Sequence, residues 1–187
     1  MSLRSLPNAI TLARLLFVPV IVWLTYSPDT GRVVLAGSLF AMAVASDWLD
    51  GYLARRLDVR SAFGTLLDPL VDKVLVLCLL CVFADRGLVP MWLALLNMAR
   101  EFAVTAVRHT ASSRSQIVGA NWMGKLKFCL QGGFIALAYL HLAVESAGGS
   151  IPGGTRLLFW SLLCVTAASY AFLLRFILLH RARLAGP

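Results

Sequence analysis

Carboxylates set between strongly apolar segments are the feature that most restricts how this chain can fold. Five of its nine Asp and Glu residues fall between positions 47 and 72, and the flanking segments 35–45 and 74–84 are strongly apolar. A carboxylate inside or at the edge of a membrane is costly and by default indicates a functional site. Asp58 lies in a polar segment and is interpreted as a solvated turn residue, so the other four carboxylates need a shared explanation.

The spacing of these four aspartates predicts a helical hairpin. Asp47 and Asp50 are separated by three residues and Asp68 and Asp72 by four, so each pair shares one face of a helix. The polar segment 55–61 between the pairs predicts a turn. An antiparallel hairpin centred on residue 59 brings all four carboxylates to a similar depth, roughly 14 to 20 Å from the turn at about 1.5 Å per residue.

Four facing carboxylates repel one another and lose hydration unless positive charge accompanies them. Hard divalent cations such as Mg²⁺ and Mn²⁺ prefer oxygen ligands. The hairpin therefore predicts a site for two divalent cations of the kind used in phosphoryl chemistry. The alternative is a charged hairpin that only caps two helices.

Composition favours a membrane protein with several spans. The 187 residues are 59% hydrophobic and their mean hydropathy is +0.80, values typical of polytopic membrane proteins. We expect an all-α fold of six transmembrane helices in one domain covering residues 1–187, with Pro or Gly in the connections. The expected helices are 8–26, 33–57, 62–84, 88–110, 120–144 and 155–179.

Basic residues predict the partners and the orientation. The net charge of +8 favours anionic lipids and phosphate-bearing substrates, and no nucleic-acid motif is present. Arginines near the predicted helix ends number eight on one side, against three on the other. The larger group predicts that both termini and the turn of the hairpin face the cytoplasm. The eight are Arg4, Arg55, Arg56, Arg60, Arg108, Arg114, Arg181 and Arg183, and the three are Arg32, Arg86 and Arg156.

A second basic group is expected where the fourth and fifth helices approach the cytoplasm. Arg100 and Arg108 lie close to two helical turns apart and share a face. Pairing of Arg100 with the adjacent Glu101 is expected to be poor, because neighbouring helical side chains diverge, so we expect a partner elsewhere. The candidate residues for binding a phosphate dianion are Arg100, Arg108, Arg114, Lys125 and Lys127. For Arg114 and Lys127 the alternative is charge that only orients helices.

The hairpin also resembles a known signature. The pattern Asp47-x2-Asp50-Gly51-x2-Ala54-Arg55-x8-Gly64-x3-Asp68-x3-Asp72 is similar to that of the CDP-alcohol phosphotransferases, with every fixed position filled at the same spacing. The resemblance implies transfer of a phosphatidyl group from CDP-diacylglycerol to an alcohol, with release of CMP. It further implies a homodimer in the bacterial cytoplasmic (inner) membrane, in contact with membrane lipids.

The resemblance also assigns roles to residues of the hairpin. The metal ligands are Asp47, Asp50 and Asp68, while Asp72 is both a further candidate ligand and the candidate general base. Gly51, Ala54 and Gly64 are expected to line the cytidine slot, and Arg55 to pair with the diphosphate.

Two more segments carry a resemblance. Asn8, Thr11 and Arg14 form one polar stripe, similar to the start of family members that make phosphatidylglycerophosphate or cardiolipin, where it lies near the metals and nucleotide. The alternative is an Asn cap with a snorkelling Arg.

The pattern Arg100-Glu101-x6-Arg108, followed by Gly124-Lys125-x-Lys127, resembles the phosphatidylglycerophosphate-forming members. It makes sn-glycerol 3-phosphate the first-choice acceptor. Phosphatidylglycerol and an inositol phosphate are alternative acceptors within the family, and a cation transporter is the alternative outside it.

Overall fold

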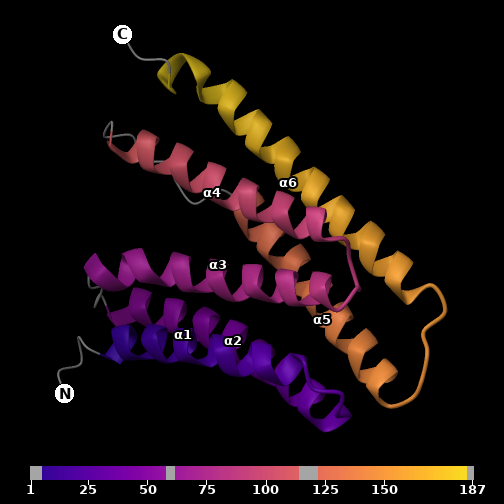
Figure 1. Ribbon diagram of the computed structural model, residues 1–187. Helices are drawn as coiled ribbons and strands as arrows, with labels where there is room; N and C mark the ends of the chain where they lie inside the picture. The colour runs from indigo at the N-terminus through magenta and orange to yellow at the C-terminus, as the bar shows by residue number, and fades with distance from the viewer. Residues whose placement is uncertain (1–5, 58–61, 114–121, 185–187) are drawn as a thin grey trace. The chain divides into compact units, whose positions relative to one another are not determined.

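The backbone of residues 6–57, 62–113 and 122–184 is described by the structure, a computed structural model. These residues form six helices and no strand, which confirms the all-helical prediction (Figure 1). The helices are α1 (Leu6–Thr25), α2 (Thr30–Leu57), α3 (Ala62–Asp85), α4 (Met91–Ser113), α5 (Trp122–Ser146) and α6 (Gly154–Leu184).

Helix bounds follow the expected ones closely, and the largest difference is at the end of α6. That helix was expected to end at residue 179 and continues to Leu184. No Gly or Pro, the residues that most readily end a helix, occurs between Gly154 and Gly186, so the backbone has no local reason to stop earlier.

The helices divide into two compact units. One contains residues 1–82 and 139–151, and the other contains residues 83–138 and 152–187. Within the first unit α1 packs along α2, and within the second α4 packs along α6 (Figure 1).

Glycines end two of the helices, as the turn signals predicted. Gly87 after α3 and Gly148 after α5 have φ of 76° and 79°, the left-handed conformation that glycine adopts without strain. The N–H of Gly87 donates to the carbonyl of Ala84, and that of Leu88 to Phe83. Gly148 and Gly149 bond back in the same way to the last turn of α5. These bonds satisfy carbonyls that a helix end otherwise leaves unpaired.

Tyr139 of α5 contacts both α1 and α2 in the first unit. Its hydroxyl lies 2.9 Å from Oγ1 of the buried Thr25, and its ring packs against Phe40 at a centroid distance of 6.4 Å. A Cβ added to Gly37 would lie 3.2 Å from this ring. The contact therefore joins α5 to both α1 and α2, and it depends on the small size of Gly37.

Two described segments are long and apolar enough to cross a membrane. They are Leu126–Ser146 and Gly154–Arg175, with mean hydropathies of 1.4 and 2.0. Large apolar side chains such as Trp23, Met42 and Trp160 are exposed, as expected where lipid replaces water as the solvent. The prediction of six spans thus has this direct support for two helices and stays a prediction for the other four.

We expect Gly37→Leu to destabilise the protein, because its side chain must displace the ring of Tyr139. Overpacking of this kind costs about 1–3 kcal/mol. Gly133→Leu on α5 is the matched control, since a Cβ there meets nothing within 4 Å. Thermal unfolding in detergent measures both variants, and equal Tm values would contradict the packing role of Gly37.

Candidate functional site

The acidic signature lies on two consecutive helices. Asp47 and Asp50 are in α2, Asp68 and Asp72 are in α3, and the two helices run in opposite directions (Figure 1). The side chains of these four aspartates, and the whole of Asp58, lie outside the described residues. The positions of the carboxylates relative to one another therefore stay a prediction.

The residues predicted to bind the CDP group lie on three helices of the first unit. Asn8, Thr11 and Arg14 are in α1; Gly51, Ala54 and Arg55 are in α2; Gly64 is in α3. The polar stripe and the start of the signature thus belong to the two helices that pack together in this unit. Only the helical placement of these residues is described.

Among the described side chains, no group of three or more His, Cys, Asp or Glu forms a metal site. The four signature aspartates lie outside that set. Their donor chemistry fits a hard divalent cation, because carboxylate oxygens are the ligands that Mg²⁺ and Mn²⁺ prefer.

Two residues of the predicted acceptor group meet in the second unit. Arg100 is in α4 and Lys127 in α5, and both contact the carboxylate of Glu101. Nη1 of Arg100 lies 2.8 Å from Oε1 of Glu101, and Nζ of Lys127 donates to the same oxygen. Arg108 is in α4 and Lys125 in α5, but their side chains, and the whole of Arg114, lie outside the described residues.

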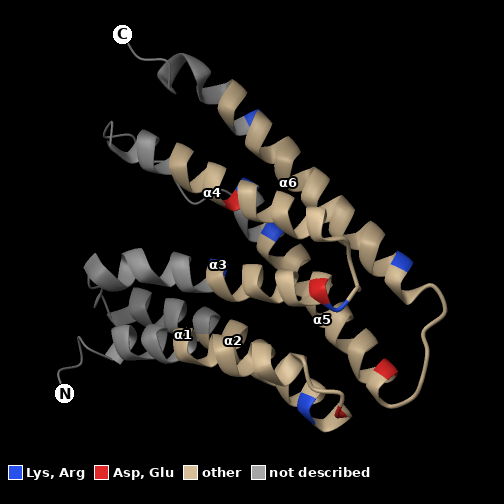
Figure 2. Cartoon of the chain, in the orientation of Figure 1, with Lys and Arg blue, Asp and Glu red and all other residues tan. Residues whose placement is uncertain are grey.

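This group of charges is buried. The exposed fractions of the side chains are 10% for Arg100, 9% for Glu101 and 12% for Lys127. Figure 2 shows both signs of charge close together along α4. Burial weakens solvent screening, so these charges interact more strongly than a surface group would.

The expectation that Arg100 pairs away from Glu101 is wrong. Adjacent Cβ atoms on a helix do diverge, but Arg and Glu side chains are long enough for their tips to meet. Both side chains are buried, and an unpaired buried charge is costly. This cost favours the conformation in which the tips of the two side chains meet.

Hydrogen bonds hold α4 against α6 beside the charged group. Asn97 lies one turn before Arg100 and is almost fully buried. Its Nδ2 donates to the carbonyl of Leu93 at 2.9 Å and to Oγ1 of Thr166 at 2.7 Å. The hydroxyl of Tyr170 donates to the carbonyl of Leu96 at 2.9 Å. These bonds fix the part of α4 from which the charged side chains project.

Two buried nitrogens near the group have no hydrogen-bond acceptor. They are Nε of Arg100 and Nε2 of Gln131. Gln131 is 2% exposed and lies one turn after Lys127, on the same face of α5. Neither Glu101 nor Gln131 was among the residues predicted to bind a substrate or metal. Glu101, like the four aspartates, is a carboxylate in an apolar helix, and such a carboxylate indicates a functional site.

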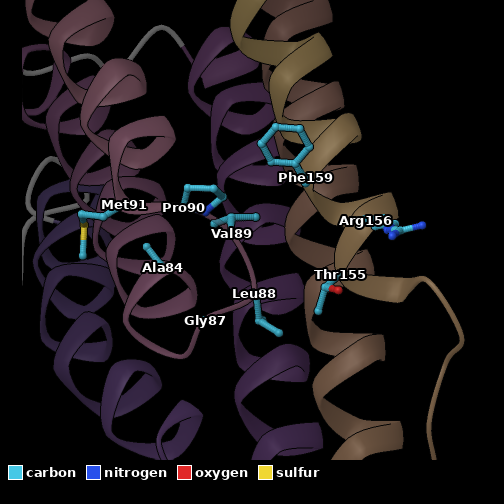
Figure 3. A pocket seen from close by; sticks show the side chains of 9 residues that line it. All are labelled: Ala84, Gly87, Leu88, Val89, Pro90, Met91, Thr155, Arg156 and Phe159. Carbon is cyan, nitrogen blue, oxygen red and sulfur yellow. The ribbon is translucent and has the colours of Figure 1, made fainter.

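A cavity of about 500 Å³ in the second unit lies where α3 connects to α4 and α6 begins. Its lining is mainly apolar and includes none of the predicted site residues. In Figure 3 the side chain of Arg156 extends away from Val89 and Pro90.

These observations define a helical membrane protein with acidic residues on one helix pair and a buried basic group on another. The chain belongs to the CDP-alcohol phosphatidyltransferase family, whose model matches residues 4–179. It is therefore an enzyme of the transferase class that acts in phospholipid synthesis. The resemblance seen in the signature is confirmed.

Individual relatives cover most of the chain. It is 38% identical over 149 residues to the CDP-diacylglycerol–glycerol-3-phosphate 3-phosphatidyltransferase of Bacillus subtilis, covering 73% of this chain and 77% of that protein. The protein of the same name from Escherichia coli K12 is 33% identical over 180 residues, covering 91% and 97%. That of Rickettsia typhi is 34% identical over 146 residues, covering 78% and 81%.

We expect the Asn97–Thr166 hydrogen bond to contribute about 1 kcal/mol to the stability of the second unit, the usual net value for a buried bond. Thr166→Val removes the acceptor with little change of shape, and Asn97→Leu removes the donor. A double-mutant cycle on the unfolding free energy isolates the coupling between the two. Strictly additive effects would contradict this contribution.

Proposed function

We propose that this enzyme transfers the phosphatidyl group of CDP-diacylglycerol to sn-glycerol 3-phosphate, forming phosphatidylglycerophosphate and releasing CMP. The observation that carries the proposal is the near full-length match to relatives named for this reaction, such as the Escherichia coli protein over 91% of the chain. The intact acidic signature supports the same reaction.

In this proposal Asp47, Asp50, Asp68 and Asp72 hold two divalent cations, Mg²⁺ or Mn²⁺. Their placement on the consecutive antiparallel helices α2 and α3 supports the assignment. When bound, such ions supply positive charge beside the diphosphate oxygens. A compensating cation also explains why a membrane protein retains four carboxylates in one short stretch.

The remaining residues of the signature bind and orient the substrates. Asp72 takes the proton from the acceptor's hydroxyl group, the hydroxyl oxygen attacks the β-phosphorus, and the bond between that phosphorus and CMP breaks. Arg55 pairs with the diphosphate. The cytidine slot is lined by Gly51, Ala54 and Gly64, and the stripe of Asn8, Thr11 and Arg14 lies beside it.

The acceptor's phosphate is bound by a basic group, consisting of Arg100, Arg108, Arg114, Lys125 and Lys127. The meeting of Arg100 and Lys127 on one buried carboxylate supports a shared site for these residues. Two nearby cations suit a phosphate dianion better than a neutral sugar or an uncharged alcohol.

The chain acts as one domain with six spans in the bacterial cytoplasmic membrane, as a homodimer among membrane lipids, with both termini and the active site toward the cytoplasm. The eight-to-three distribution of arginines supports this orientation. Glycerol 3-phosphate and divalent cations are water-soluble and reach the site from that side, while the lipid tails of the donor stay in the bilayer.

The test of this function is CMP release by the purified protein in detergent, with CDP-diacylglycerol and Mg²⁺ or Mn²⁺. We expect release with sn-glycerol 3-phosphate and none with phosphatidylglycerol or an inositol phosphate. Release with phosphatidylglycerol alone would instead identify a cardiolipin synthase. Metal flux into liposomes without CDP-lipid would favour a transporter.

Asp72→Asn is expected to lower kcat by about 10²–10⁴-fold, the usual contribution of a general base. The side chain keeps its size but cannot accept the hydroxyl proton. Asp58→Asn, outside the signature in the same hairpin, is the matched control and should keep full activity. Near-normal turnover by Asp72→Asn would refute the assignment of the base.

A further inference from the structure

The cavity in the second unit combines an apolar lining with a single cation. It has a volume of about 500 Å³, within the range of about 300–1,000 Å³ that is usual for small-molecule sites. Leu88 and Val89 of its lining are each 4% exposed. Arg156 is the one charged residue among those that line it, and none of the lining residues is acidic. Such a cavity suits a ligand with an apolar part and a negative group.

The cavity lies at the edge of a membrane-spanning segment. Gly154–Arg175 is long and apolar enough to cross a membrane, and Arg156 is in its first turn. The rings of Trp92 and Trp160 both pack against that of Phe159, at centroid distances of 6.3 and 5.2 Å. Both tryptophans are exposed, and exposed tryptophan is typical of the boundary between membrane and water. The cavity is therefore at the depth where lipid headgroups meet their acyl chains.

The guanidinium group of Arg156 is available to a ligand. The side chain is exposed, and within the part of the chain that the structure describes it forms no hydrogen bond or ion pair. Figure 3 shows it extending away from Val89 and Pro90, toward the outside of the cavity. A guanidinium presents several N–H donors in one plane, which match the oxygens of a phosphate group.

An anionic phospholipid matches the cavity better than the other phosphate-bearing ligands. A free phosphate ion would leave the apolar lining without a partner. A zwitterionic lipid would bring a positively charged group close to Arg156, and the lining contains no carboxylate to receive it. An anionic phospholipid supplies an apolar part and a negative phosphate without that additional cation.

We propose that this cavity binds one anionic phospholipid of the surrounding membrane. The lipid phosphate pairs with Arg156, and the glycerol and the upper part of an acyl chain lie against Leu88, Val89 and Phe159. The site contacts the end of α3 and the beginnings of α4 and α6, so the bound lipid stabilises the second unit. It is not a substrate site, and the proposal does not depend on the proposed function.

The two parts of the site have to act together. An exposed ion pair contributes little by itself, because water screens it. The apolar lining attracts any acyl chain and does not distinguish headgroups. Selective binding therefore needs one ligand that carries both an acyl chain and an anionic headgroup, which explains why the cation stands at the rim of an apolar cavity.

Thermal unfolding of the full-length protein in detergent tests the proposal, because a ligand that binds the folded state raises Tm. The three probes are phosphatidylserine, phosphatidylcholine with the same acyl chains, and inorganic phosphate. We expect phosphatidylserine to raise Tm in a concentration-dependent way that gives its Kd. Phosphatidylcholine should raise Tm less, and inorganic phosphate should not raise it.

Arg156→Gln tests the headgroup contact. We expect Kd for phosphatidylserine to rise about tenfold, the consequence of losing a hydrogen bond between charged groups, and the preference over phosphatidylcholine to disappear. Arg156→Lys keeps the charge and should recover part of the affinity. Arg175→Gln is the matched control, because it removes an exposed arginine from the same helix about 28 Å away at about 1.5 Å per residue. The control should leave Kd unchanged.

Ala84→Phe tests the apolar part without changing any charge. Ala84 lines the cavity, so a phenyl ring there occupies space that the lipid needs. We expect the variant to lose the Tm shift with phosphatidylserine although Arg156 is intact. Ala136→Phe, an exposed position of α5 outside the cavity lining, is the matched control and should keep the shift. If Ala84→Phe does not fold, the comparison of Arg156→Gln with Arg175→Gln still decides the proposal.

Four outcomes would overturn the inference. Equal shifts with phosphatidylserine and phosphatidylcholine would mean that the headgroup is not recognised. A shift with inorganic phosphate as large as that with phosphatidylserine would indicate a site for free anions. Equal weakening by Arg156→Gln and Arg175→Gln would indicate a general effect of charge. A full shift in a folded Ala84→Phe variant would place the lipid elsewhere.

Discussion

The rest of this structure depends on one constraint, which is that charge placed in apolar helices must be balanced. In the second unit, Arg100 and Lys127 both contact the buried carboxylate of Glu101. The proposed function balances the four aspartates of α2 and α3 with divalent cations. Under the proposed function, ligands contribute to this balance, so charges that are costly to bury are also the ones expected to bind ligands.

Much of the fold could be predicted from the sequence, because the signals are local. Long apolar runs set the six helices, and Gly87 and Gly148 adopt the left-handed conformation at helix ends that turn residues indicate. The family could also be predicted from the sequence, because the segment from Asp47 to Asp72 forms a dense pattern with fixed spacing. The continuation of α6 beyond residue 179 to Leu184 was not predicted.

Side-chain contacts were harder to predict from the sequence. The sequence places Arg100 beside Glu101, but spacing alone suggested divergence, whereas the tips of these long side chains meet. Lys127 reaches the same carboxylate from α5, a contact that no local pattern reports. Gln131 was overlooked because an amide in an apolar helix has no distinctive spacing. Its meaning depends on burial and on the absence of an acceptor for Nε2.

The hydrogen bonds from Asn97 to Thr166 and from Tyr170 to Leu96 hold α6 against the part of α4 that carries Arg100 and Glu101. None of the residues proposed to bind the substrates or metals lies on α6, yet that helix determines where α4 presents Arg100 and Glu101. Under the proposed function, changes of acceptor preference can therefore arise from substitutions on α6 that never touch a substrate. A search for altered specificity by random mutagenesis should include this helix, and not only the residues around the phosphate.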